Sequence, residues 1–143
     1  MTPGLIFAKP TRRNRTTNKF RAKKTQLTPG GRWYDSKLEA DYRRQLELMQ
    51  RAGAIKDLID QPQVYLTAAQ VGYRPDFAYT DVSTGEKMFV ECKGFETEGY
   101  RLKLKLWRVY GPGKLLIVKR RGKGAPEVMD IIIADTNKQE GKL

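Results

Sequence analysis

Residues 74–94, RPDFAYTDVSTGEKMFVECKG, have the alternating pattern of a β-hairpin that charged residues interrupt. The two predicted arms cover residues 73–81 and 87–93, with the turn-forming sequence STGE between them. Side chains at positions i and i+2 of a strand share a face, so Glu91 and Lys93 are expected to point the same way. Asp76 lies on the other arm, so the pairing of the arms decides whether it joins them.

The hydrophobic pattern predicts that pairing. An even connection, over residues 84–85 or 83–86, places Phe77 opposite Cys92 and collects the apolar side chains on one face. A three-residue connection would shift the register by one residue and turn Phe77 to the polar face. The further pairs expected in the even register are Tyr79 with Val90 and Asp81 with Met88.

The same register brings three charged side chains together. Asp76 lies opposite Lys93 and diagonally from Glu91, at typical Cβ separations of about 5 Å and roughly 7 Å. Mg²⁺ prefers oxygen ligands and keeps several waters, so the two carboxylates could share one ion. Such an ion polarises a phosphate and lowers the pKa of water, while Lys93 would orient that water or stabilise developing charge. The alternative is a cross-strand salt bridge on an exposed face.

The segments around the hairpin predict two helices and further strands. Before it, YDSKLEADYRRQLELMQRAG has apolar residues at helical spacing, a capping box at Ser36 and Glu39, and a C-terminal stop at Gly53. Strands are predicted near residues 55–59 and 64–67. After the hairpin, length favours a helix over residues 98–110 with Thr97 as its cap. KLLIVKR is then a short buried strand, and VMDIIIAD is either a strand or a helix.

The composition restricts the possible chemistry. A net charge of +12 indicates a polyanionic partner, most economically nucleic acid, although composition alone leaves an anionic membrane open. The absence of histidine excludes Ser-His-Asp hydrolases and His-ligated zinc, so hydrolysis would need carboxylates, lysines and a hard metal. No apolar run approaches about 18 residues, as a membrane span would. With one cysteine and no secretory signal pattern, we expect a cytoplasmic protein.

The basic residues are concentrated at the start of the chain. We divide the sequence into a basic arm over residues 1–32, a folded domain over residues 33–135 and a frayed tail over residues 136–143. The arm is either a solvated, disordered segment or a segment that follows phosphates. Lysines of the second predicted helix either solvate its outer face or contact phosphates as well. The candidate nucleic-acid-binding residues are Arg12, Arg13, Arg15, Lys19, Arg21, Lys23, Lys24, Lys103 and Lys105.

The order of the charged residues resembles that of a known superfamily. Glu39 on a first helix, Pro75-Asp76 entering a strand and Glu91-Cys92-Lys93 on the next strand resemble the PD-(D/E)XK nucleases. The sequences YDSKLEA, GAIKDLIDQP, YRPDFAY and VECKG also resemble a family of small phage proteins of uncharacterised activity within that superfamily, related to Holliday-junction-resolving enzymes. The resemblance covers about residues 33–119. It implies an α/β (α+β) fold with a restriction-endonuclease-like α-β-β-β-α-β core, in which helices flank a central mixed sheet.

The resemblance also implies roles for individual residues. By position, Asp76 and Glu91 would be metal ligands, Lys93 the catalytic lysine, and Glu39 a carboxylate that assists a metal directly or through water. The implied cofactor is Mg²⁺, which Mn²⁺ could replace. Glu39 has an alternative role as the capping-box partner of Ser36.

The implied function is cleavage of DNA by a metal-dependent, structure-selective endonuclease of the Holliday junction resolvase type. It would act on branched DNA as a homodimer in phage replication or recombination. One alternative is a PD-(D/E)XK nuclease with restriction-like or single-strand-directed cleavage. Another is a basic nucleic-acid-binding protein without catalysis. A membrane-surface protein would need an amphipathic basic helix that the sequence lacks.

Overall fold

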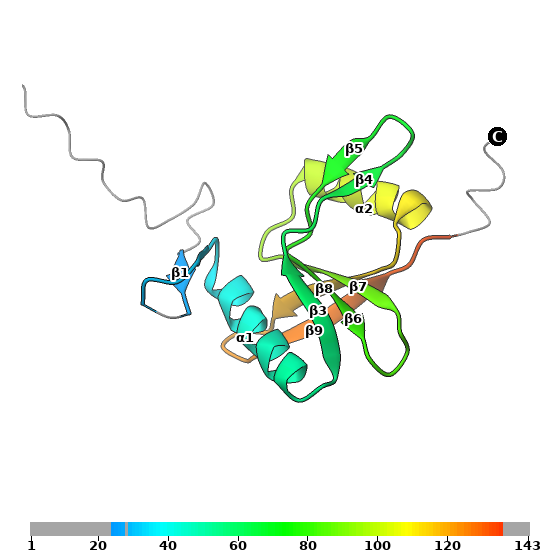
Figure 1. Cartoon of the computed structure of the whole chain (residues 1–143). Helices are drawn as coiled ribbons and strands as arrows, with labels where there is room; N and C mark the ends of the chain where they lie inside the picture. Colours follow the sequence, from blue (N-terminus) through cyan, green and yellow to red (C-terminus); the bar gives the residue numbers. More distant parts are fainter. Residues whose placement is uncertain (1–23, 28, 136–143) are drawn as a thin grey trace, which may run out of the picture.

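A computed structural model of the chain describes residues 24–27 and 29–135, and its centre is a five-stranded mixed sheet (Figure 1). The strand order is β3-β6-β7-β8-β9, in which β7 and β8 are parallel and the other neighbours antiparallel. The strands are β3 (Ile55–Asp60), β6 (Phe77–Asp81), β7 (Lys87–Cys92), β8 (Lys114–Arg120) and β9 (Pro126–Ile132). The helices are α1 (Lys37–Arg51) and α2 (Glu98–Tyr110). The predicted α+β fold and its α-β-β-β-α-β order are confirmed, with β9 added at the edge.

Two apolar clusters lie on opposite faces of this sheet, because side chains alternate along each strand. One cluster joins α1 to β6 and β7 through residues such as Leu46, Phe77 and Val90. The other joins α2 to the same strands through Trp107 and Phe89. Figure 1 shows α1 beside β3, and α2 next to the small β4–β5 hairpin, with the sheet between the helices.

Helix α1 has the predicted termini. The Ser36 hydroxyl accepts a hydrogen bond from the Glu39 N–H at 3.1 Å, which satisfies one free donor of the first turn. At the other end, Gly53 has a φ of +80°, and its N–H donates to the Gln50 carbonyl while the Ala54 N–H donates to the Met49 carbonyl. These two bonds form a Schellman motif, so Gly53 ends the helix as expected.

Helix α2 covers the predicted residues 98–110 and has Thr97 as its N-cap. Within this helix Tyr100 and Trp107 are buried, whereas Leu102 is 55% exposed. The Trp107 indole is fully buried and donates a hydrogen bond to the Gly113 carbonyl at 2.9 Å. It also meets the Phe89 ring edge-on, with centroids 5.1 Å apart. Trp107 therefore fixes α2 on the sheet.

Two short hairpins complete the fold. Strands β4 (Val64–Leu66) and β5 (Val71–Tyr73) pair with each other, so the first predicted hairpin arm, residues 73–81, is divided between β5 and β6. The division falls at the residues Arg74, Pro75 and Asp76, because a proline has no N–H for a ladder bond. The second predicted arm is also shorter, since β7 ends at Cys92.

The other short hairpin changes the boundary of the basic arm. Strands β1 (Thr25–Gln26) and β2 (Trp33–Tyr34) pair with each other, and Leu27 packs against the apolar cluster of α1. The folded part therefore includes residues 24–27, which the sequence assigned to the arm. Residues 1–23 and the predicted tail, residues 136–143, lie outside the described residues.

The register of the main hairpin differs from the predicted one by two residues. The even connection is confirmed, but it consists of residues 82–85, and Phe77 pairs with Val90 instead of Cys92. Asp81 causes the shift: its carboxylate accepts hydrogen bonds from the N–H and hydroxyl of Ser83, and its backbone pairs with Glu86. A shift of two residues keeps every side chain on its predicted face.

Three other predicted pairs are corrected by the same shift. Tyr79 lies opposite Met88 and not opposite Val90, and Asp81 closes the loop with Glu86. Asp76 does not lie opposite Lys93, since its N–H donates to the Val90 carbonyl at 2.8 Å.

The undecided segment near the C-terminus is a strand, β9, which pairs with β8 at the edge of the sheet. Its side chains are mostly exposed. Among the described residues, no helix is long and apolar enough to cross a membrane.

Gly111 provides a test of the packing around Trp107. A Cβ added at this position would lie 2.4–2.7 Å from atoms of the indole ring. We expect Gly111→Ala to lower the free energy of unfolding by about 1–3 kcal/mol, because a buried ring has no room to move. Urea unfolding measures this. Gly99→Ala, in the first turn of α2 with open space around it, is the control and should not lower stability. Parent-like stability of Gly111→Ala would contradict the packing.

Candidate active site

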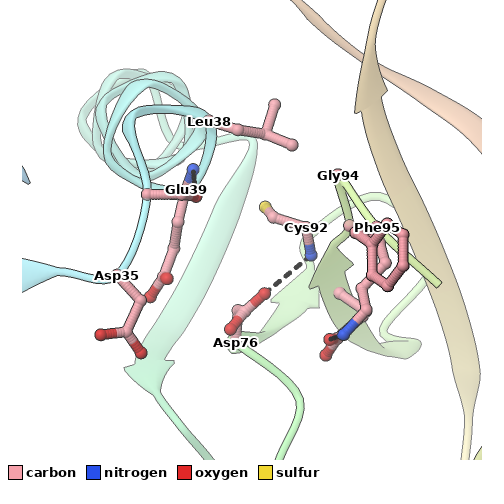
Figure 2. A pocket seen from close by; sticks show the side chains of 10 residues that line it. Asp35, Leu38, Glu39, Asp76, Cys92, Gly94 and Phe95 are labelled. Atoms are coloured by element: carbon pink, nitrogen blue, oxygen red, sulfur yellow. Dashed lines mark hydrogen bonds and ion pairs between the residues drawn. The ribbon is translucent and has the colours of Figure 1, made fainter. Parts of the chain in front are cut away.

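The candidate site is a cavity of about 440 Å³ at the end of the sheet where β6 begins and β7 ends. The first turn of α1 forms one wall, and the end of β7 with the loop after it forms the other (Figure 2). The charged residues that line it are Asp35, Glu39, Asp76, Glu91 and Lys93. The structure thus brings all four predicted catalytic residues to one cavity.

Asp76 is held by three hydrogen bonds, two to β7 and one to the residue after β3. Its backbone N–H donates to the Val90 carbonyl, and its own carbonyl accepts from the Gln61 N–H, both at 2.8 Å. One carboxylate oxygen, Oδ2, accepts a hydrogen bond from the Cys92 N–H at 2.7 Å, as Figure 2 shows. Asp76 is therefore fixed relative to the end of β7, and its other oxygen remains for the cavity.

Glu91 and Lys93 form an ion pair on the wall opposite α1. The Lys93 Nζ lies 3.7 Å from Glu91 Oε1 and 4.6 Å above the centre of the Tyr100 ring. Glu91 is 7% exposed, and its second oxygen, Oε2, is buried without a hydrogen-bond partner within the described residues. A buried carboxylate oxygen without a partner is costly, so it indicates a site for a further ligand or donor.

Glu39 comes from the first turn of α1. Its backbone N–H serves the Ser36 cap, while its side chain is 4% exposed and extends into the cavity beside Asp35 (Figure 2). The backbone N–H of Glu39 thus completes the Ser36 cap, while its carboxylate lines the cavity. The positive end of the α1 dipole lies at the same place and favours negative charge there.

The carboxylates of the cavity hold protons more tightly than free carboxylates do. Burial raises the pKa of Glu39 to about 8, and the charges of Asp76 and Asp35 add to the effect. Burial likewise raises the pKa of Glu91 to about 8, again with a contribution from Asp76. For Asp76, burial outweighs the Cys92 N–H and the Lys93 ammonium, and the pKa rises to about 6. The cavity therefore disfavours its own negative charge and favours a cation that would offset it.

The residues of the cavity fit Mg²⁺ in a partly hydrated form. Within the described part of the chain, no three Asp, Glu or Cys side chains are placed to hold a metal ion by themselves. Mg²⁺ does not require three, because it usually keeps several waters and binds one or two carboxylates. The two carboxylates line the same cavity, and Asp76 has one oxygen left beside the one that accepts from the Cys92 N–H. Asp76 and Glu91 would hold the ion, and Glu39 would contact its water.

The predicted nucleic-acid-binding residues fall into three groups. Lys24 is the one arm residue among them that the structure describes, and it directly precedes β1. Lys105 is exposed on α2, whereas the Lys103 Nζ donates to the Gly72 carbonyl at 2.7 Å and so ties α2 to β5. The remaining members, Arg12, Arg13, Arg15, Lys19, Arg21 and Lys23, lie outside the described residues.

Three residues at or beside the cavity were not singled out from the sequence. Asp35 lies directly before the Ser36 cap, lines the cavity and raises the pKa of Glu39. Asp35 precedes Glu39 by four residues, and this spacing could have indicated that the two carboxylates lie close together. Phe95 is 62% exposed where it lines the cavity. Tyr73 affects the pKa of Glu91 from β5, and no spacing in the sequence relates the two residues.

The raised pKa values predict an unusual dependence of stability on pH. The folded-state pKa of Glu91 lies above the ordinary value of 4.5, so its contribution to stability is present below that value and is lost as the pH rises through about 8. In EDTA, we expect the free energy of unfolding to fall between pH 5.5 and 8.5. Glu91→Gln should flatten this fall and be more stable at pH 8.5 by on the order of 1–3 kcal/mol.

Urea unfolding at both pH values provides the measurement. Glu127→Gln, an exposed carboxylate on β9, is the control and should follow the parent. If the stability of Glu91→Gln depends on pH as the stability of the parent does, folding does not raise the pKa of Glu91.

One family model matches the chain. It covers residues 17–123, which include α1, the main hairpin, α2 and β8, and it is described as a protein of unknown function (DUF1064). Among curated proteins, none is similar enough in sequence to be matched to this chain. Because the match extends over most of the sequence and contains the whole cavity, the chain belongs to the DUF1064 family.

Proposed function

We propose that this protein is a Mg²⁺-dependent endodeoxyribonuclease. The observation that carries the proposal is the convergence of Asp76, Glu91, Lys93 and Glu39 on one cavity. The sequence resemblance to PD-(D/E)XK nucleases supports it, since the same residues carry that resemblance. The order of helices and strands is also the one that the resemblance implies.

The residues of the cavity have separate tasks in this mechanism. Asp76 and Glu91 would hold the ion, and the Cys92 N–H keeps Asp76 in a fixed direction. Mg²⁺ supplies polarisation of the scissile phosphate and lowers the pKa of water, which produces the nucleophile. The Lys93 ammonium lies where it can donate to a phosphate oxygen and stabilise the developing charge. Glu39 accepts a hydrogen bond from water at the opposite wall.

DNA is the expected substrate because of the charge of the chain. The net charge of +12 would attract a polyanion over a long range, and the basic N-terminal arm would add phosphate contacts. We further propose selectivity for branched or otherwise structured DNA and action as a homodimer, because opposed cuts across a junction need paired active sites. Both features come from the resemblance to junction-resolving enzymes.

A second candidate function is nucleic-acid binding without catalysis. The ion pair between Lys93 and Glu91, 3.7 Å long, favours it, because the two residues already neutralise each other in the absence of a metal. Cleavage assays separate the two candidates.

The first test removes a metal ligand. We expect Asp76→Ala to reduce Mg²⁺-dependent cleavage by more than about 100-fold, since losing even a group that supports a ligand costs 10- to 100-fold. The substrates are matched four-way junction, flap, duplex and single-stranded DNA. Binding of the same DNA in Ca²⁺ should persist, because Ca²⁺ occupies an oxygen site without the strict geometry of Mg²⁺.

Glu86→Ala, an exposed carboxylate just before β7 and so at the end of that strand away from the cavity, is the matched control and should cleave like the parent. If Asp76→Ala also cleaves like the parent, the site is misassigned. A parent that binds DNA but cuts none of the substrates with Mg²⁺ or Mn²⁺ favours the second candidate.

The second test concerns Phe95, which is 62% exposed on the loop that follows Lys93 and lines the cavity. An exposed aromatic ring beside a phosphate site can stack on a base that has left the duplex, a contact worth about 1–3 kcal/mol. We expect Phe95→Ala to weaken binding to a four-way junction by about fivefold or more, with a smaller effect on duplex.

Dissociation constants in Ca²⁺ measure this without cleavage. Phe95→Trp should restore junction binding, and Leu102→Ala, an exposed apolar residue of α2, should leave it unchanged. Equal losses on junction and duplex would show that Phe95 does not select unstacked bases.

A further inference from the structure

Three buried oxygens without a hydrogen-bond partner belong to residues on the α2 side of the cavity. They are Glu91 Oε2 and the hydroxyl oxygens of Tyr73 and Tyr100. Folded proteins satisfy most buried polar groups, so such atoms near one another call for a physical explanation. The carboxylate of Glu91 can only accept a hydrogen bond when ionised, whereas each hydroxyl can donate one.

The two Glu91 oxygens have different surroundings. Oε1 lies 3.7 Å from the Lys93 ammonium, which is itself placed 4.6 Å above the Tyr100 ring. Oε2 makes no hydrogen bond within the described residues. Glu91 lies two residues after Phe89 in β7 and so points to the same face of the sheet, where the Tyr73 ring packs against the cluster that contains Phe89. The Tyr73 hydroxyl is thus the available donor for Oε2.

Tyr73 is held in place independently of the cavity. Its ring meets the fully buried Trp107 edge-on, with centroids 5.9 Å apart and planes at 77°. The preceding residue, Gly72, accepts a hydrogen bond from the Lys103 ammonium at 2.7 Å, so α2 fixes the backbone of β5. Val64 pairs with Tyr73 across the small hairpin. A side chain fixed in this way can define the orientation of a neighbour that is less constrained.

We propose that Tyr73 is a positioning residue for Glu91. Its hydroxyl would donate a hydrogen bond to Oε2 and keep the carboxylate in the orientation in which it would hold the metal. Groups that hydrogen-bond a metal ligand fix its orientation and typically change metal affinity by 10- to 100-fold. The inference rests on the proposed metal site, and it gives the β4–β5 hairpin and Lys103 a part in organising that site.

Tyr73→Phe tests the inference, because it removes one hydroxyl and keeps the ring against Trp107. Calorimetric titration with Mg²⁺ in the absence of DNA is the readout. We expect Tyr73→Phe to weaken Mg²⁺ binding by about 10- to 100-fold, with an unchanged circular dichroism spectrum. Tyr65→Phe, on the same hairpin but 62% exposed, is the matched control and should bind Mg²⁺ like the parent.

The outcomes separate this inference from the proposed function. If the parent binds no Mg²⁺, or binds it no better than Asp76→Ala does, the metal site itself is wrong. If the parent binds Mg²⁺ and Tyr73→Phe binds it equally well, the positioning role is wrong and the metal site stands.

A double-mutant cycle in EDTA provides a second measurement that does not depend on metal. The shift in thermal midpoint caused by Tyr73→Phe should differ between the parent and the Glu91→Gln background, because the hydroxyl and the carboxylate interact directly. Additive shifts would overturn the proposed hydrogen bond.

Discussion

The hydrogen bond from the Cys92 N–H to the Asp76 carboxylate joins the start of β6 to the end of β7, and the candidate site depends on it. It forms because the four-residue loop lets Phe77 pair with Val90, which brings Asp76 beside the end of β7. Pro75 is fully buried and directly precedes Asp76. Because proline has no backbone N–H, the hydrogen-bond ladder between β6 and β7 does not continue past Asp76. The position of one carboxylate thus follows from backbone geometry, and the cavity forms around it.

The cavity exists at an electrostatic cost. Burial raises the pKa of Glu39, Asp76 and Glu91, and repulsion by the Asp76 charge adds to this effect for Glu39 and Glu91. Lys93 and the N-terminus of α1 compensate for part of this charge. The apolar clusters on both faces of the sheet provide the stability that permits such a site. An electrostatic cost of this kind is expected at a site where a bound cation or substrate balances the charge.

Helix α2 connects the core to the cavity. Trp107 packs against Phe89 on the sheet and against Tyr73 on the β4–β5 hairpin, so one side chain positions two elements. Lys103, which sequence reasoning placed among the candidate DNA contacts, ties β5 to the same helix. The wall behind Glu91 is therefore built by aromatic packing on α2, and α1 builds the opposite wall.

Short-range pattern by itself determined the α+β fold, the limits of α1 and α2, the even hairpin loop and the grouping of Asp76, Glu91 and Lys93, because side-chain periodicity and caps act between near neighbours. The hydrophobic pattern left the register of that hairpin open among several even loops, and the Asp81 carboxylate selects one of them through its local bonds to Ser83. Only the tertiary structure decided the contacts that bring Tyr73 to the α2 side of the cavity. Those contacts depend on how separate elements pack across the sheet, and the spacing of residues along the chain carries no information about that packing.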